Sequence, residues 1–235
     1  MEEFCCVKHL LLILNPTSGM RKAARNLTDI ISVFNRADYD THVYVTACHG
    51  DAAKAVHQFG SEADIIVCCG GDGTLNETVT GVIEDGLDVP IGYIPSGSTN
   101  DFASSLHLSD DVVEAAGQIV SGSETAYDVG RFGDRYFTYI ASFGAFTKVS
   151  YSTPQNIKNT LGHMAYVLEG MQELHECVMA LHNQTYNCGM ITFRNAGGVH
   201  VTGNPSMMWS LDGEKAEGSE KIMIENLHKR ITLIH

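Results

Sequence analysis

The fold is decided by residues 65–75, which read IIVCCGGDGTL. The apolar run Ile65–Cys69 is typical of a strand buried on both faces, as in a parallel sheet. The three glycines that follow, among four consecutive positions, allow positive φ angles and a close approach of the backbone to a ligand. A helix that begins near Leu75 would direct unpaired N–H groups at this loop, where they favour an anion such as phosphate. The stretch therefore predicts a strand, a phosphate-binding turn and a helix, although a plain tight turn is the simpler alternative.

The sequence on both sides repeats this alternation of short apolar runs and helical periodicity. The predicted strands are Leu10–Leu14, His42–Thr46 and Ile91–Ile94, and the predicted helices are Arg21–Phe34, Asp51–Phe59 (with Asp51 as N-cap), Leu75–Glu84 and Val112–Ile119. Alternation of this kind predicts an α/β domain with a parallel sheet. Open sheets of this class bind ligands outside the carboxyl ends of their strands, so the loops at those ends are the candidate site.

The pattern changes after Ser123, where we place a domain boundary. Residues 1–123 form the expected α/β domain and residues 124–235 a β-rich one. Its predicted elements are strands at Tyr127–Phe132, Tyr136–Phe143, Met190–Phe193, Val199–Thr202, Met207–Leu211 and Arg230–Ile234, and a helix at Asn156–Glu173.

Composition excludes several classes of protein. The 15 Lys and Arg residues against 28 Asp and Glu residues give a net charge of −13, so a uniformly basic groove for nucleic acid is not expected. No apolar run approaches the ~20 residues of a membrane span. The seven cysteines form no CxxC pair, and Cys68 and Cys69 are expected to be buried free thiols, which favours a reducing cytoplasm. The 11 histidines show no metal-ligand spacing.

Five short motifs narrow the function. They are NPTSG at 15–19, GGDGT at 70–74, PSGSTNDFA at 95–103, DVG at 128–130 and LDGE at 211–214. The second is not a Walker loop, because no Gly-Lys-Ser/Thr follows it. It is similar to a signature shared by lipid kinases, NAD kinases and phosphofructokinases. In this order, the five motifs resemble the diacylglycerol kinase catalytic domain family, which includes sphingosine kinases. Residues 143–166 look most like its soluble bacterial branch.

The resemblance implies a phosphofructokinase-like nucleotide-binding domain followed by a mostly β, sandwich-like domain, with ATP and Mg²⁺ between them. By family analogy, the cofactor-binding residues are Asn15, Thr17, Ser18, Gly19, Gly70, Gly71, Asp72, Gly73, Thr74, Ser98, Thr99 and Asn100. The implied metal ligands are Asp72, Asp101 and Asp128. The implied catalytic residues are Asp212, Glu214 and Asp128.

The chemistry of phosphoryl transfer agrees with these residue types. Transfer depends on positioning, on Mg²⁺ to neutralise charge, and on a carboxylate that accepts the proton of the attacking hydroxyl. We expect Asp212 to be that base, with Glu214 close by, although Leu211–Glu214 taken alone would be a plain turn. The expected reaction is the ATP-dependent phosphorylation of diacylglycerol, or a related lipid alcohol, to phosphatidic acid.

The chain departs from the family pattern in its second half. An acidic, metal-binding element that the family carries after the position of Leu174 is not found before Met207. The second domain is therefore expected to be truncated internally, which would leave sheet edges unpaired unless a second copy of the chain, as in a homodimer, covers them. A second hypothesis is thus a catalytically impaired relative that binds nucleotide or lipid. A third, an enzyme like NAD kinase, is disfavoured by Asn76 and Glu77 after the glycine loop, and by the motifs at 100–102 and 211–214.

A lipid substrate requires contact with a membrane surface. Because the net charge is −13, we expect local cations to provide it: Arg21, Lys22, Arg25, Lys148 and Lys158. The expected location is the cytoplasm, peripheral at the inner membrane face, with salt-sensitive binding and no nucleic-acid partner.

Overall fold

The structure is a computed structural model that describes residues 7–143 and 194–235. The predicted helix at 156–173, the predicted strand at 190–193, Lys148 and Lys158 lie outside these ranges. So does the stretch in which we expect the internal truncation. Within the described ranges, no helix is long and apolar enough to cross a membrane.

The first half is built on a parallel sheet, as predicted. Its strands are β1 (Lys8–Leu14), β2 (Tyr39–Val45), β3 (Ile65–Gly70) and β4 (Ile91–Pro95), in the order β2-β1-β3-β4. Every residue of β3 is buried, which explains its unbroken apolar run. Cys68 and Cys69 are buried free thiols, as expected, and burial raises the pKa of Cys69 to about 12.

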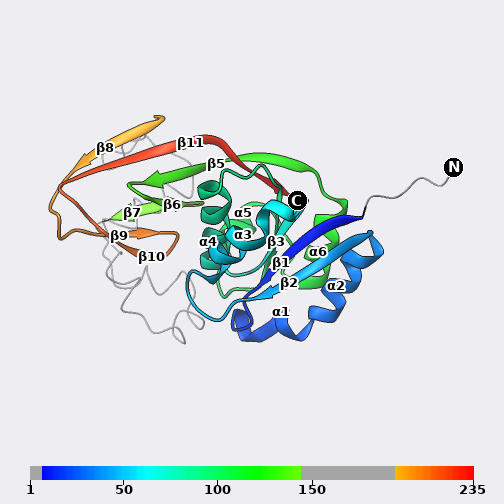
Figure 1. Ribbon diagram of the computed structural model, residues 1–235. Helices are drawn as coiled ribbons and strands as arrows, with labels where there is room; N and C mark the ends of the chain where they lie inside the picture. The colour runs from blue at the N-terminus through cyan, green and yellow to red at the C-terminus, as the bar shows by residue number, and fades with distance from the viewer. Residues whose placement is uncertain (1–6, 144–193) are drawn as a thin grey trace.

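Helices cover both faces of this sheet (Figure 1). On one face lie α1 (Lys22–Arg25), α2 (Leu27–Arg36) and α6 (Val112–Ser121), and on the other α3 (Asp51–Phe59), α4 (Asp72–Glu84) and α5 (Asp101–Ser105). Neighbouring residues of β1 serve the two cores: Leu12 packs with Ile30 and Phe34, whereas Leu11 packs with Leu75. This alternation explains why strands of the sheet are apolar at both odd and even positions.

The helix predicted at 21–34 is broken. A 3-10 turn, η1 (Gly19–Arg21), comes first, with positive φ at Met20 and Arg21. The chain breaks again at Asn26, whose side-chain amide donates to the carbonyl of Lys22 at 2.8 Å. An amide side chain that bonds the local backbone competes with the helical pattern, so α2 begins only at Leu27.

Two predicted helix starts are also corrected. The N-cap of α3 is Gly50, at φ 87°, and Asp51 is its first helical residue. The Asp51 carboxylate accepts instead from the backbone N–H groups of Ala47 (2.8 Å) and Cys48 (3.1 Å) in the preceding loop. Helix α4 begins at Asp72, within the glycine loop, and not at Leu75.

The second half is mostly β, as predicted. The strands are β5 (Glu124–Phe132), β6 (Arg135–Phe137), β7 (Ala141–Phe143), β8 (Gly198–Thr202), β9 (Met208–Leu211), β10 (Glu214–Glu217) and β11 (Lys221–Ile234). Strands β7, β9 and β10 form a separate antiparallel sheet. A core of its own, with Phe132, Trp209 and Ile222 among its members, holds this region together.

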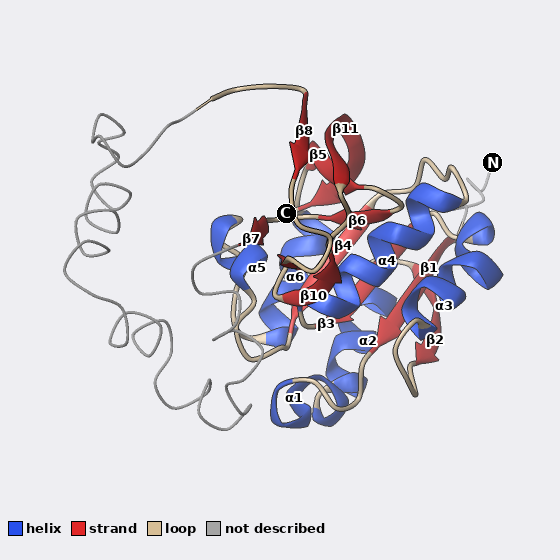
Figure 2. Cartoon of the chain, turned by 90° about the vertical axis from the view of Figure 1, so that its left-hand side faces the viewer, coloured by secondary structure: helices blue, strands red, loops and turns tan. Residues whose placement is uncertain are grey.

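Strand β11 joins the two halves (Figure 2). It pairs antiparallel with β5 and, at Leu233 and Ile234, parallel with β4, so one sheet runs in the order β2-β1-β3-β4-β11-β5-β6. The sequence predicted only its last five residues, because polar residues interrupt residues 221–229. The domain boundary after Ser123 stays a prediction, and this sheet is continuous across it.

Candidate functional site

Three loops meet at the carboxyl ends of β1, β3 and β4, and their backbones touch. A Cβ on Gly19, which has φ 41°, would lie 2.0 Å from the carbonyl oxygen of Ser96. A Cβ on Gly97 would lie 2.6 Å from the Cα of Gly71. Side chains at these glycines would therefore force the loops apart. The structure thus brings together the three loops that the sequence predicted to bind nucleotide.

Side chains of the first loop hold this arrangement. Asn15 donates from Nδ2 to Thr74 Oγ1 at 3.1 Å, and its Oδ1 accepts from the N–H (3.1 Å) and hydroxyl (2.9 Å) of Thr17. The hydroxyl oxygens of Ser18 and Ser96 are 2.7 Å apart. Asn15, Thr17 and Ser18 therefore position the loops on one another, and Thr74 of the glycine loop belongs to the same network.

The third loop is shaped by Asn100. This residue is in the left-handed region at φ 51° and precedes α5. Its Oδ1 accepts from the N–H of Gly97 at 2.9 Å, and its Nδ2 donates to the carbonyl of the same residue at 3.1 Å. Ser98 and Thr99 are left exposed between them. Asn100 thus fixes the loop, and the two hydroxyl residues stand at its surface.

Asp72 has a buried carboxylate oxygen without a hydrogen-bond partner among the described residues. Its Oδ2 accepts from the N–H of Asp101 at 3.3 Å, whereas Oδ1 is buried with no hydrogen-bond partner in the described residues. Burial raises the pKa of the Asp72 carboxyl, and the charges of Asp101 and Asp212 act in the same direction. Mg²⁺ commonly binds through one or two carboxylates together with waters and substrate phosphates. Asp72, with Asp101 beside it, therefore fits a Mg²⁺ ion that arrives with a nucleotide.

Asp128 does not join this pair. It lies on β5 between Tyr127 and Val129, which pack toward the core that contains α4 and α5, so its own side chain points to the opposite face. Its carboxylate accepts from Asn226 Nδ2 at 2.6 Å and from the N–H of Lys229 at 2.8 Å, and lies 2.9 Å from His228 Nδ1. In residues 7–143 and 194–235, no cluster of three or more His, Cys, Asp or Glu could hold a metal ion. The expected set of Asp72, Asp101 and Asp128 is thus not assembled.

Asp212, the predicted base, is fully engaged in hydrogen bonds. It occupies the turn between β9 and β10 at φ 49°. Its carboxylate accepts five: from Asn76 Nδ2 (3.1 Å), from the N–H (2.7 Å) and hydroxyl (3.0 Å) of Thr138, and from the N–H groups of Tyr139 and Ile140 (2.9 Å each). These bonds also divide the strand predicted at 136–143 into β6 and β7, because the intervening N–H groups donate to Asp212. The geometry favours a structural role for this carboxylate.

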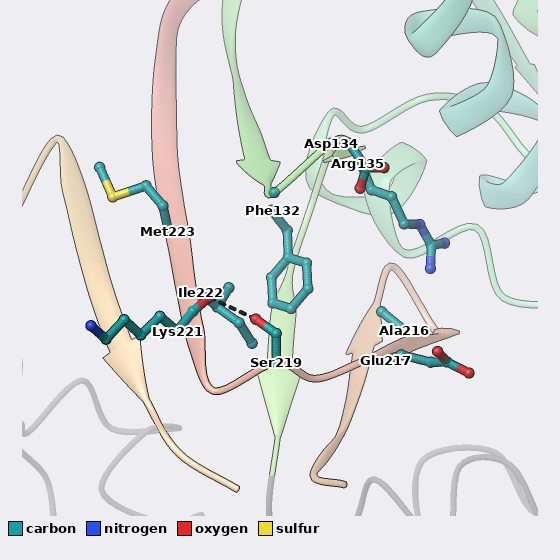
Figure 3. A pocket seen from close by; sticks show the side chains of 10 residues that line it. Phe132, Asp134, Arg135, Ala216, Glu217, Ser219, Lys221, Ile222 and Met223 are labelled. Atoms are coloured by element: carbon teal, nitrogen blue, oxygen red, sulfur yellow. Dashed lines mark hydrogen bonds between the residues drawn. The ribbon is translucent and has the colours of Figure 1, made fainter. Parts of the chain in front are cut away.

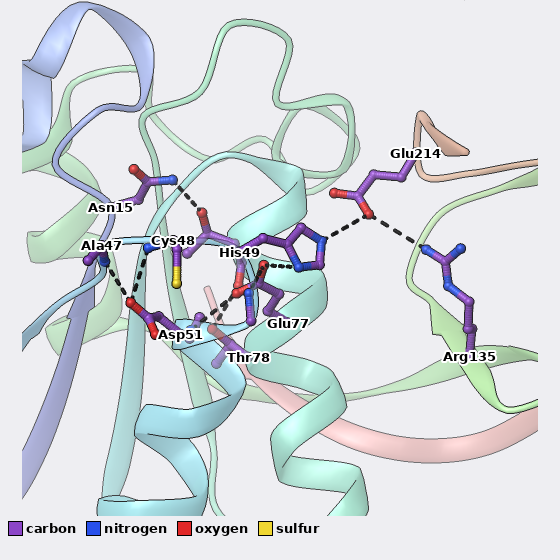
Figure 4. Close-up of polar contacts among 12 residues, drawn as sticks. Asn15, Ala47, Cys48, His49, Asp51, Glu77, Thr78, Arg135 and Glu214 are labelled. Atoms are coloured by element: carbon purple, nitrogen blue, oxygen red, sulfur yellow. Dashed lines mark hydrogen bonds and ion pairs between the residues drawn. The ribbon is translucent and has the colours of Figure 1, made fainter. Parts of the chain in front are cut away.

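Glu214, two residues further on, contacts the glycine loop directly. Its Oε1 lies 3.0 Å from where a Cβ on Gly73 would stand. Its Oε2 is 3.7 Å from His49 Nε2 and 3.6 Å from an Arg135 guanidinium nitrogen (Figure 4). The side chain is 41% exposed. A partly exposed carboxylate beside the glycine loop is chemically able to accept a proton from a hydroxyl.

Sequence reasoning gave no site role to Asn76 and Glu77. Asn76 donates to Asp212 and to the carbonyl of Tyr136 (3.0 Å), and thereby ties α4 to the β-rich region. The carboxylate of Glu77 accepts from the N–H groups of Gly50 (2.8 Å) and Ala52 (3.1 Å) at the start of α3. Helical spacing could have placed Glu77 near the glycine loop, because it lies one helical turn after Gly73. No such signal pointed to His49 or Arg135, because they lie far from the glycine loop in the sequence, in the loop after β2 and at the start of β6.

A cavity of about 400 Å³ lies elsewhere, between the β5–β6 turn, β10 and the start of β11 (Figure 3). Phe132, Arg135, Glu217 and Ile222 are among the residues that line it. Among the described residues, no predicted site residue lines this cavity. The three loops and Glu214 are therefore the better candidate for chemistry.

Comparisons with known proteins agree with the motifs and the fold. A family model described as "Diacylglycerol kinase catalytic domain" matches residues 9–132. The diacylglycerol kinase of Staphylococcus haemolyticus is 40% identical over 164 residues, which are 69% of this chain and 50% of that protein. The diacylglycerol kinase of Staphylococcus aureus strain MRSA252 is 38% identical over 171 residues, or 71% of this chain and 53% of that protein.

A solved structure described as a diacylglycerol kinase of Bacillus anthracis shares the fold, with a TM-score of 0.80 at 21% identity and 97% of each chain covered. A second Bacillus anthracis structure has a TM-score of 0.82, also at 21% identity, and covers 100% of this chain and 98% of that one. The chain spans about half the length of the curated relatives it matches. Because the family model covers more than half of its residues, the chain belongs to the diacylglycerol kinase catalytic domain family.

Proposed function

We propose that this chain is an ATP-dependent lipid kinase that transfers a phosphoryl group to the hydroxyl of diacylglycerol, or of a related lipid alcohol, to give phosphatidic acid. The observation that carries the proposal is the meeting of two carboxylates at one glycine loop. Asp72 presents there a buried oxygen that has no hydrogen-bond partner in residues 7–143 and 194–235, and Glu214 presents a partly exposed carboxylate next to Gly73. The names of the relatives support diacylglycerol as the substrate class.

The three loops would bind the phosphates of ATP. Their close packing at Gly19, Gly71 and Gly97 brings the backbones of the three loops together. The N-terminus of α4 at Asp72 adds unpaired N–H groups and the positive end of the helix dipole. Asp72 and Asp101 would hold Mg²⁺, which supplies charge neutralisation on the transferring phosphoryl group.

Glu214 is the proton acceptor in this proposal, in place of Asp212. The carboxylate of Asp212 already accepts five hydrogen bonds, so its lone pairs are occupied by these donors. Glu214 Oε1 faces the glycine loop and can take the proton of the lipid hydroxyl as that oxygen attacks. Asp212 then acts by holding the β9–β10 turn, and with it Glu214, against α4.

Membrane contact remains part of the proposal. Arg21, Lys22 and Arg25 are exposed around Met20, which is 90% exposed. Each cation near an anionic surface contributes about 1 kcal/mol, which fades beyond a Debye length. Binding to vesicles that contain phosphatidylglycerol should therefore occur at low salt and weaken at high salt. Binding that does not respond to salt would contradict this electrostatic account.

Turnover with labelled ATP tests the function. The chain, with Mg²⁺ and γ-³²P-ATP, is offered dioleoylglycerol in detergent micelles, sphingosine or NAD in parallel, with the Asp72→Asn variant as the blank. Label on dioleoylglycerol alone is the expected result. Binding of ATP and lipid without transfer would favour the catalytically impaired relative, and label on NAD would favour an enzyme like NAD kinase. A homodimer stays a prediction, which sedimentation of the same preparation would test.

A further inference from the structure

His49 stands between two carboxylates that belong to different parts of the fold. Its Nδ1 lies 3.5 Å from Glu77 Oε1, and its Nε2 lies 3.7 Å from Glu214 Oε2 (Figure 4). His49 belongs to the loop after β2, whereas Glu77 is on α4 and Glu214 begins β10. One imidazole therefore spans the parallel-sheet half and the β-rich half, beside the glycine loop.

The two oxygens of Glu214 have different surroundings. Oε2 is the atom near both His49 and Arg135, whereas Oε1 is the atom that faces Gly73. Arg135 also donates from Nη1 to the carbonyl of Lys215 at 2.9 Å, so it restrains the β10 strand from its own side. His49 approaches from the opposite half. The two side chains therefore flank Oε2, while Oε1 is directed at the loop.

The backbone around His49 is fixed although the side chain is 79% exposed. On one side, the N–H groups of Ala47 and Cys48 donate to the Asp51 carboxylate. On the other, the N–H of Gly50 donates to Glu77 Oε1 at 2.8 Å. The imidazole is thus placed by bonded neighbours in its own loop, and not by burial.

We propose that His49 is a positioning residue for phosphoryl transfer: it holds Glu214 Oε2 so that Oε1 faces the glycine loop. The inference rests on the proposed role of Glu214. The charged groups around the imidazole are Glu77 and Glu214, with Arg135 beyond Glu214 and Asp51 and Lys54 on the adjoining helix. A contact between exposed polar side chains of this kind adds little to stability. The effect of His49 is therefore expected in turnover and not in folding.

The kinetic test compares two histidines that each lie between two carboxylates. His57 is the matched control, because its Nδ1 is 2.8 Å from Asp85 and its Nε2 is 3.4 Å from Glu84, in contacts that involve no proposed site residue. We expect His49→Ala to lower kcat about 10-fold, within the ~10²-fold that a 1 Å misplacement can cost. KM for ATP should stay unchanged, and His57→Ala should leave both constants unchanged. Equal losses in both variants would overturn the proposal.

A double-mutant cycle shows whether His49 acts through Glu214. If it does, His49→Ala causes no further loss of turnover in a Glu214→Gln background. The same full loss in both backgrounds would mean that His49 acts by another route, and would overturn the proposal. The conservative variant His49→Gln, which keeps a side-chain N–H but no charge, should retain more activity than His49→Ala.

A readout without turnover separates this inference from the proposed function. The side-chain carboxyl ¹³C resonance of Glu214 is identified as the one that Glu214→Gln removes. We expect His49→Ala to shift this resonance and His57→Ala to leave it in place. If wild type transfers no phosphate to dioleoylglycerol, the proposed function fails while this measurement still reports on the contact. A resonance that His49→Ala does not move would overturn the inference itself.

Discussion

The glycine loop and the β9–β10 turn both carry an Asp-Gly pair, yet they use the carboxylate in opposite ways. Asp72 of the loop keeps one buried oxygen without a partner in the described residues. Asp212 of the turn accepts five hydrogen bonds. The metal-binding role proposed for Asp72 would explain this lack of donors, because a buried and unsatisfied group otherwise only costs stability. A carboxylate that organises a turn is saturated with donors.

The difference arises from the surroundings of each residue. Asp72 lies between Gly71 and Gly73, which offer no side-chain donors, and at the start of α4. Asp212 faces three successive N–H groups of residues 138–140 and the amide of Asn76. The same dipeptide is therefore a candidate ligand in one place and a structural anchor in the other. Because Asp212 is saturated with donors, we propose Glu214 as the base.

The largest expected effect is on turnover in Glu214→Gln. Loss of the proton acceptor should lower kcat by about 10²–10⁴-fold, with KM for ATP unchanged, because Gln keeps the shape of the side chain. The matched control is Glu217→Gln, an exposed position on the same strand. Steady-state kinetics with dioleoylglycerol measures both variants. Turnover like that of wild type in Glu214→Gln would return the role of base to another group.

Asp72→Asn should separate activity from stability. Turnover should fall by about 10²–10³-fold, as when one preorganised electrostatic group is removed from an active site. Thermal stability at pH 7 should rise, because burial raises the pKa of Asp72 and the charged form therefore disfavours the folded state. Activity and melting temperature are measured on the same preparation. A lower melting temperature would show that Asp72 is a structural residue like Asp212.

Asp212→Asn, in contrast to Asp72→Asn, should lower the stability of the fold. The amide retains one oxygen but turns an NH₂ group toward backbone N–H donors, so donors at 138–140 lose their acceptor. We expect the free energy of unfolding to fall by about 1–3 kcal/mol. Urea unfolding at pH 7 measures it, with Asp134→Asn, in the β5–β6 turn, as the control. If stability is kept while kcat falls as far as in Glu214→Gln, Asp212 is the base after all.

Whether a feature of the fold could be predicted from the sequence depends on the interactions that determine it. The parallel sheet was predictable, because strands buried on both faces carry unbroken apolar runs such as Ile65–Cys69. The first nine residues of β11 were not, because polar residues interrupt them.

The site was predictable as a set of loops and not as a set of roles. The motifs correctly gathered the loops at 15–19, 70–74 and 95–100. The direction of Asp128 depends on which face of β5 reaches the core. The donors to Asp212 are mostly backbone N–H groups more than seventy positions away, which no local pattern encodes.

The smallest expected effect concerns pH, and it sets Asp72 against Asp128. The pKa of the Asp128 carboxyl is lowered. The largest cause is the hydrogen bond from the Asn226 side chain, and the Lys229 N–H and His228 lower it further. A carboxyl whose pKa is lower in the folded state stabilises the fold above its unfolded-state pKa, and that stabilisation is lost as the pH falls through the folded-state value. The pKa of Asp72 is raised in the folded state, so its effect on stability has the opposite sign. The destabilisation by its charged form appears as the pH rises from the unfolded-state pKa to the folded-state pKa.

Urea unfolding midpoints of the two Asp→Asn variants, measured across a series of acidic to neutral pH values, should therefore diverge from that of wild type in opposite directions. Relative to wild type, Asp128→Asn should lose stability, and Asp72→Asn gain it, as the pH is raised toward 7. Because Asp128 is exposed, its change should be the smaller one. Two variants that respond to pH in the same direction would refute the assignment of opposite roles to these carboxylates.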